Sequence, residues 1–107
     1  MPFTIRPYSR FPVCCPVIYQ TGFFEGHGTV RNVSLTGWRF SANLPLRIGE
    51  VCSLTVHLAD QEPIYVAAAI VCWLRGGEYR VETLVIDDDS RVEMEEYISQ
   101  CSARGVV

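Results

Sequence analysis

The chain has 107 residues, 49% of them hydrophobic, which is enough for one domain with a single core. Its net charge of −3 and its pI near 5.3 exclude a surface that is basic overall, so no DNA or RNA partner is expected. No apolar run reaches the length of a transmembrane helix, and the N-terminus lacks the charged and then apolar order of a signal peptide. These features predict a cytoplasmic domain without membrane insertion.

The N-terminal residues show no hydrophobic period and contain two prolines, so residues 1–11 are predicted to be a flexible arm. Residues 12–107 are predicted to form a single domain. Its first strand is expected at Pro12–Gln20, where apolar residues alternate. Pro12 and Pro16 place this strand at an edge or an end, because proline cannot donate to a strand ladder.

Five further strands are expected, because alternating or continuous apolar runs lie between turn residues. They are Gly28–Val33, Trp38–Ser41, Cys52–Leu58, Ile64–Leu74 and Tyr79–Ile86. Ile64–Leu74 is apolar on both faces, which indicates a central position. Gly22 and Gly26 are expected to bracket a loop between the first two strands.

The last segment changes period. Acidic residues precede Ser90, and Ser90-x-x-Glu93 fits the capping box of a helix N-terminus. Apolar residues at helical spacing follow from Met94, so one stripe can pack on the sheet. The sequence therefore predicts a mainly β fold, a small antiparallel six-stranded β-barrel with one C-terminal helix.

No metal site, cofactor or catalytic residue is expected. His27 and His57 have no partner at metal-ligand spacing, and the acidic run Asp87–Asp89 lacks the spaced oxygens of a calcium loop. Neither a P-loop nor a nucleophile elbow is present, so an enzyme is not expected. The cysteines have no Cys-x-x-Cys spacing and are predicted to be reduced thiols that mostly fill the core; they are Cys14, Cys15, Cys52, Cys72 and Cys101.

Two interpretations apply to the polar stretch Asn32-Val33-Ser34-Leu35-Thr36-Gly37 between two expected strands. In the first it is a tight turn, in which Asn and Ser side chains bond the local backbone and Gly37 supplies a positive φ. In the second, Asn32 and Ser34 offer amide and hydroxyl groups to a ligand, and Gly37 allows close approach.

Arg6 and Arg10 lie on the predicted arm and also have two interpretations. An isolated arginine pair is commonly a solvated surface. The alternative is anion binding, because the guanidinium fork bonds both phosphate and the Hoogsteen edge of guanine. All nine basic residues of the chain are arginine, so every cation can bind in this way.

An Arg-x-x-x-Arg segment followed by a β domain with Asn-x-Ser-x-x-Gly resembles the PilZ family. The likeness extends over nearly the whole chain, including the Arg-Phe-Pro-Val at Arg10–Val13 and the Val-Cys-Trp at Val71–Trp73. It implies a PilZ-like split barrel and cyclic di-GMP as the ligand of both motifs. The residues that match the two motifs are Arg6, Arg10, Asn32, Ser34 and Gly37.

The chain departs from the family pattern in its last strand. The family often has a glycine followed three residues later by phenylalanine, and Glu82 and Val85 stand in those places. This departure is expected to affect the packing of the strand rather than the ligand motifs. Of the aromatic residues that are able to stack on bases, Trp73 is expected to fill the core, and Phe23 and Phe24 to form an exposed loop contact.

The resemblance implies a bacterial cyclic di-GMP receptor or adaptor, without catalysis, that signals to an unidentified downstream protein. The competing hypothesis is a PilZ-like interaction module of pilus or motility assembly that binds no nucleotide. Such modules typically lack the Arg-x-x-x-Arg segment that is present here.

Overall fold

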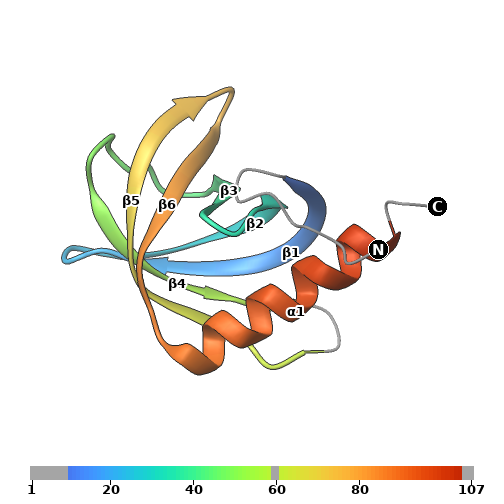
Figure 1. Ribbon diagram of the computed structural model, residues 1–107. Helices are drawn as coiled ribbons and strands as arrows, with labels where there is room; N and C mark the ends of the chain where they lie inside the picture. The colour runs from blue at the N-terminus through green and yellow to red at the C-terminus, as the bar shows by residue number, and fades with distance from the viewer. Residues whose placement is uncertain (1–9, 59–60, 105–107) are drawn as a thin grey trace.

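A computed structural model describes residues 10–58 and 61–104, and its strands close into an antiparallel barrel with a helix packed against it (Figure 1). The elements are β1 (Phe11–Gln20), β2 (Glu25–Val33), β3 (Gly37–Ala42), β4 (Val51–Val56), β5 (Ile64–Arg75), β6 (Glu78–Ile86) and α1 (Asp88–Arg104). The strands pair in the order β1-β2-β3-β6-β5-β4, and β1 pairs with β4 to close the barrel. The predicted fold class is confirmed.

The pairing of β1 explains its prolines. β1 pairs with β2 along most of its length, but with β4 only over Val17–Gln20. Pro12 therefore has one neighbouring strand, and Pro16 lies where the pairing with β4 begins, with its carbonyl accepting a hydrogen bond from the backbone N–H of His57 at 3.0 Å. This agrees with the expected edge character, because a proline there breaks no ladder on the open side.

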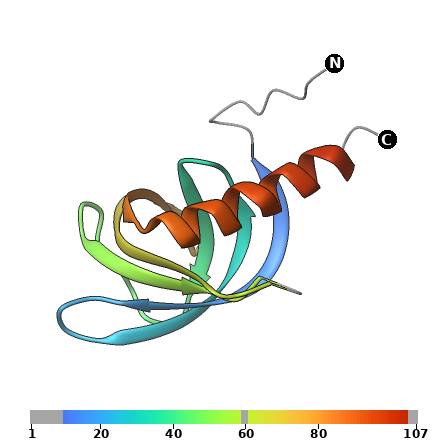
Figure 2. The ribbon, with the colours of Figure 1, turned by 60° about the horizontal axis from the view of Figure 1, so that its bottom comes forward.

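The interior of the barrel is filled by the inward residues of all six strands and by two residues of α1. Figure 2 shows α1 lying across the barrel, and two residues of the helix, Met94 and Ile98, are buried. The largest fully buried side chains are Trp38, Tyr19, Phe40, Leu54, Ile64 and Ile98. The helix is therefore required to complete the core. As a separate finding, the helix is not long and apolar enough to span a membrane.

β2 begins three residues earlier than expected, because Gly26 belongs to the strand and not to the border of the loop before it. A Cβ atom at Gly26 would collide with the ring of Tyr19, and one at Gly28 would collide with the backbone carbonyl of Ser41. The expectation that Gly26 borders the loop is therefore wrong. Close packing, rather than turn geometry, requires glycine at these positions.

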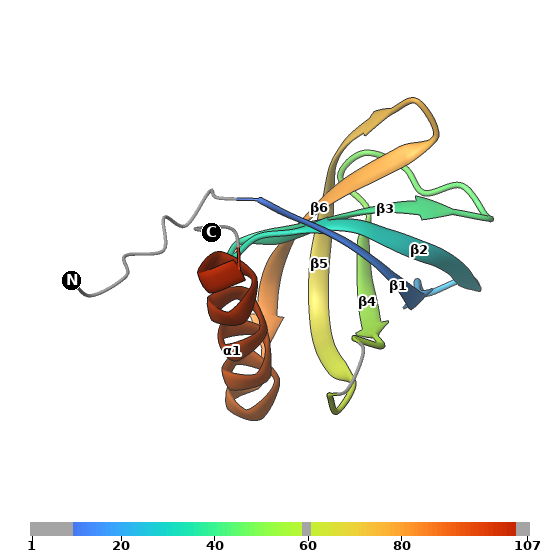
Figure 3. The ribbon, with the colours of Figure 1, turned by 90° about the vertical axis from the view of Figure 1, so that its right-hand side faces the viewer.

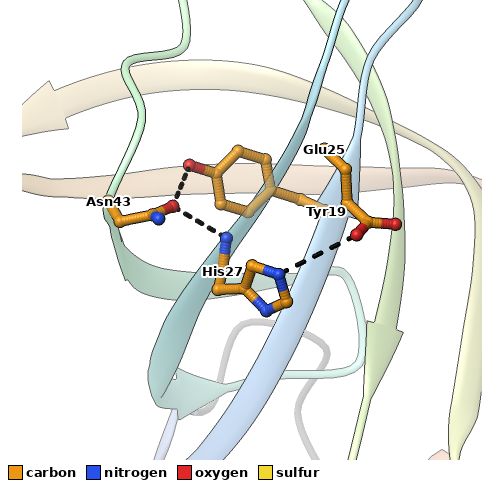
Figure 4. A network of polar contacts seen from close by, with 4 residues as sticks. All are labelled: Tyr19, Glu25, His27 and Asn43. Carbon is orange, nitrogen blue, oxygen red and sulfur yellow. Dashed lines mark hydrogen bonds and ion pairs between the residues drawn. The ribbon is translucent and has the colours of Figure 1, made fainter.

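Tyr19 ties the β3–β4 connection to the barrel wall (Figure 4). Its hydroxyl donates to the Leu44 carbonyl at 2.6 Å and lies 3.3 Å from the Asn43 amide oxygen. That oxygen also accepts from the backbone N–H of His27 at 2.8 Å, and the His27 ring lies 3.8 Å from the Glu25 carboxylate. Through these contacts, His27 helps to hold together the end of the barrel that lies away from α1 (Figure 3).

The helix begins earlier than the capping box predicts. α1 starts at Asp88, and the Asp87 carboxylate accepts a hydrogen bond from the backbone N–H of Ser90 at 2.7 Å. Asp87 is therefore the N-cap residue, and the assignment of that role to Ser90 is wrong. The Ser90 hydroxyl instead accepts from the backbone N–H of Tyr65 at 3.0 Å, which fixes the helix to β5.

All five cysteines are unpaired, but they do not share one environment. Cys15 and Cys52 are buried, and burial raises the pKa of each thiol to about 11. Cys14 is exposed, whereas Cys72 and Cys101 are partly buried. The description of the cysteines as core residues therefore holds fully only for Cys15 and Cys52.

Candidate functional site

The side chain of Ser34 holds the turn between β2 and β3. Its buried hydroxyl accepts hydrogen bonds from the backbone N–H groups of Thr36, at 3.4 Å, and Gly37, at 3.2 Å. The backbone N–H of Ser34 donates to the Gly37 carbonyl at 2.9 Å. The turn interpretation accounts for these contacts. A contact between Ser34 and a ligand stays a prediction.

Gly37 is the first residue of β3 and lies opposite Glu82 of β6. A Cβ atom at this position would collide with the backbone carbonyl of Val81, so the two strands meet here only because residue 37 is glycine. The expectation of a positive φ at Gly37 is wrong. Among the described glycines, positive φ occurs at Gly49, Gly76 and Gly77.

Four side chains from neighbouring strands form a row on the outer surface of the barrel. Asn32 of β2 lies opposite Arg39 of β3, Arg39 lies opposite Arg80 of β6, and Arg80 lies opposite Trp73 of β5. Directly opposite residues share one face of a sheet, so these four side chains are neighbours. Together with Arg10, they are called the cationic face below.

Two β-bulges create this row. In β2 the register shifts between Val30 and Asn32, and in β5 it shifts between Val71 and Trp73. Val30 and Val71 point into the core, so regular alternation would also point Asn32 and Trp73 inward. The extra residue in each strand reverses this and places both side chains outside. Bulges of this kind commonly re-aim side chains at functional sites.

Trp73 therefore differs from its sequence prediction. It is only partly buried and does not belong to the core, and the guanidinium carbon of Arg75 lies 5.4 Å from the centre of its ring. The expected core position of Trp73 is wrong, because the bulge in β5 was not recognisable from the apolar pattern. Trp38 is the fully buried tryptophan. Of the two loop aromatics, Phe23 is exposed as expected, and Phe24 packs against the core.

Arg80 is the most buried charge of the cationic face. Its residue surface is 7% exposed, and its guanidinium makes no hydrogen bond or ion pair with another described residue. Burial lowers the pKa of the Arg80 guanidinium, and the like charge of Arg10 lowers it further, while Glu82 and Cys72 act in the opposite sense. Desolvating a cation beside a second cation costs free energy, and an anion bound at this point would offset that cost.

The other members of the cationic face complete its polar character. The side-chain oxygen of Asn32 is buried and has no hydrogen-bond partner in the described structure. The Nε atom of Arg39 lies 3.3 Å from the carboxylate of Glu78. Arg10 is exposed and directly precedes β1. Arg6 and the predicted arm, apart from its last two residues, lie outside the described residues.

The departure from the family pattern in β6 lies on the outer surface of the barrel. Glu82 and Val85 are both exposed, so neither disturbs the core. Glu82 instead acts electrostatically on Arg80. An effect of the departure on the packing of the strand stays a prediction, and the glutamate contributes to the charge balance of the cationic face.

This arrangement is chemically suited to an anionic ligand with planar bases. Arginines bind phosphate through forked bonds, an aromatic ring stacks on a base, and the Asn32 oxygen accepts from a base N–H. Sequence reasoning found Arg10 and Asn32 but did not find Arg39 or Arg80. Their signal in the sequence is a charged residue within an apolar strand. The described residues contain no group of three or more side chains that could hold a metal ion.

Comparison with known proteins gives a consistent result. A family model described as the PilZ domain matches residues 4–100. The fold is similar to the PilZ domain of CeSA from a cellulose-synthesizing bacterium, with a TM-score of 0.67 and 16% identity, over 86% of this chain and 96% of that one. It is also similar to the Bacillus subtilis inhibitor of motility (MotI/DgrA), with a TM-score of 0.72 and 19% identity, over 92% of this chain but only 52% of that protein. No curated protein sequence matches at a significant level.

Proposed function

The chain belongs to the PilZ domain family, and on this premise we propose that it is a bacterial receptor for cyclic di-GMP. The dinucleotide binds at the cationic face, and the bound state is recognised by a partner protein. The proposed role is that of a receptor or adaptor in the cytoplasm, without catalysis.

The environment of Arg80 carries this proposal. A guanidinium that is largely removed from water, lies near Arg10 and makes no ion pair with a described residue is suited to an anion supplied from outside. Cyclic di-GMP offers two phosphates to these arginines and guanine edges to the same donor forks. The Asn32 oxygen is buried without a partner in the described structure, so a guanine N–H that reaches it would satisfy it, and the Trp73 ring, over which Arg75 lies, is proposed as a stacking surface.

The N-terminal segment is proposed to take part through Arg6 and Arg10. Its ordering on binding consumes part of the contact free energy, because fixing each residue costs roughly 1–2 kcal/mol of chain entropy. Cyclic di-GMP should therefore slow hydrogen exchange at Tyr8–Phe11 together with Asn32–Gly37. Protection of the turn without protection of the N-terminal segment would show that this segment does not become ordered when cyclic di-GMP binds.

Isothermal titration with cyclic di-GMP tests the proposal directly. The chain should bind with measurable heat, and Arg10→Ala should weaken binding by about a hundredfold, since a forked pair of charge-assisted bonds is lost. Arg47→Ala is the control, because Arg47 is exposed on the β3–β4 connection. Cyclic di-AMP and GTP should compete poorly, since the first lacks guanine and the second lacks the two-fold shape. Absence of binding by the unmodified chain would refute the proposal.

A second candidate function is an interaction module that binds no nucleotide. One observation favours it: the hydroxyl of Ser34 is engaged within the turn and is buried, so it is not presented to a ligand. The process proposed for such a module is pilus or motility assembly. The same titration separates the two functions, because only the receptor gives heat with cyclic di-GMP.

A further inference from the structure

A groove of about 450 Å³ lies between the end of β6, the β2–β3 turn and α1. It is called the β6–α1 groove below. Figure 3 shows α1 beside the end of β6 that leads into the helix. The apolar side chains that line the groove are Leu35, Leu84, Ile86 and Met94. Leu84 is 55% exposed, and together with the other apolar lining it forms an apolar surface that is available to a partner.

The last part of β6, beyond Thr83, has no strand partner on the side of the groove. β6 pairs with β3 only over Glu78–Glu82, although it continues beside β5 to Ile86. The N–H of Thr83 still reaches the Thr36 carbonyl at 2.9 Å, and no strand follows on that side. A strand with one free side is a template for a second extended segment.

The side chain of Thr83 gives an independent indication. Thr83 lines the groove, and its hydroxyl oxygen is buried without a hydrogen-bond partner in the described structure. An unsatisfied buried hydroxyl costs free energy that a bound backbone group would recover. The groove thus offers hydrogen-bonding groups as well as apolar contacts.

The shape and charge of the groove limit what fits in it. Residues of β6 and of α1 both line the groove, and its volume of about 450 Å³ suits a short single segment rather than a second sheet. Glu82 and Glu95 line it against one cation, Arg91. The exposed surface of α1 adds further acids, including Asp88 and Asp89. A basic segment is therefore favoured over an acidic one.

We infer that the β6–α1 groove binds an extended segment of a partner protein, with alternating apolar residues and at least one lysine or arginine. The apolar residues contact Leu84 and Ile86, and the basic residue pairs with Glu95. This interaction goes beyond nucleotide binding and does not depend on it. The two sites nevertheless share the turn, since Leu35 and Thr36 line the groove and Asn32 belongs to the cationic face.

The test uses random peptides displayed on phage and selected against the whole chain in the absence of nucleotide. The enriched peptides should share alternating apolar residues and a basic residue. Fluorescence polarisation of the synthetic peptides then gives their affinities. Leu84→Glu and Glu95→Arg should each weaken binding by at least about tenfold, as expected for changes to central contacts.

Two matched controls separate the groove from the surface in general. Leu74→Glu changes a leucine of similar exposure on β5, and Glu96→Arg reverses a neighbouring charge on α1 that does not line this groove. Both should change the peptide affinity by less than about twofold, since rim charges and distant residues contribute little. Circular dichroism should show that the test and control variants, all at exposed positions, have the melting temperature of the unmodified chain.

The proposal is overturned if no peptide is enriched, or if the enriched peptides bind Leu84→Glu as well as the unmodified chain. Peptide binding that appears only after deletion of residues 1–9 would assign the groove to the chain's own N-terminal segment. A concentration-dependent dimer that Leu84→Glu abolishes would assign it to a second copy. Because the titrations contain no nucleotide, their failure is distinguishable from a failure to bind cyclic di-GMP.

Discussion

Replacement of Arg80 by methionine should change ligand affinity and fold stability in opposite directions. Methionine keeps the length of the buried stem and removes the charge. Without ligand, the variant loses a desolvated cation that burial and Arg10 both disfavour. We expect the free energy of unfolding to rise by about 1 kcal/mol, near the lower end of the range for replacing buried charges with apolar groups, because Glu82 offsets part of the penalty.

The same substitution removes a forked contact to phosphate. Charge-assisted hydrogen bonds contribute roughly 1.5–3 kcal/mol each, and because Arg80 is already buried in the free protein, binding does not have to pay for its desolvation again. A net loss of about 2–3 kcal/mol corresponds to about 30- to 150-fold weaker binding of cyclic di-GMP. Arg80→Lys keeps the charge and loses the fork, so its affinity for cyclic di-GMP should lie between those of the unmodified chain and of Arg80→Met.

Calorimetric titration measures the affinity, and thermal unfolding without ligand measures the stability. A gain of 1 kcal/mol should raise the melting temperature by about 4–8 °C in a domain of this size. Arg47→Met is the control, because Arg47 is exposed on the β3–β4 connection and should change neither quantity. Unchanged affinity in Arg80→Met would remove Arg80 from the binding site. Weaker binding combined with a lower melting temperature would show that the loss comes from unfolding, and the reasoning on its buried charge would be refuted.

Three further predictions concern the fold. Ser34→Ala should lower the free energy of unfolding by about 1–2 kcal/mol, because buried N–H groups of the turn lose their acceptor; an unchanged midpoint in urea would contradict this. Asp87→Ala should cost about 1 kcal/mol in the same assay through loss of the helix cap, whereas Asp87→Asn should retain most of it. At about pH 8, Cys14 should react with a thiol reagent in the folded chain, and Cys15 and Cys52 only after unfolding, because burial raises the pKa of both to about 11. Equally fast labelling of all three would argue against the buried positions.

The number and type of the elements could be predicted because each depends on local pattern. Alternating apolar residues identify the strands, and the change to helical spacing after Ile86 identifies the helix. The errors lie where a neighbour distant in sequence decides the outcome. Gly26 was assigned to a loop because glycine favours turns, yet the Tyr19 ring opposite it is the reason for glycine. At the helix start, Asp87 and Ser90 are both good caps, and Ser90 is engaged by Tyr65 of β5.

Local sequence patterns are enough to predict which residues face the barrel interior over most of each strand, where the helix lies, and which motifs carry polar groups for a ligand. That Asn32, Arg39, Arg80 and Trp73 form one row follows only from the way the strands pair. The physical reason is that strand register is set by pairing between distant segments. A single bulge in β2 or β5 reverses the face of the residues that follow it, and no local sequence pattern predicts either bulge. The lowered pKa of Arg80 likewise cannot be predicted from local pattern, because only the fold buries its guanidinium and brings Arg10 near it.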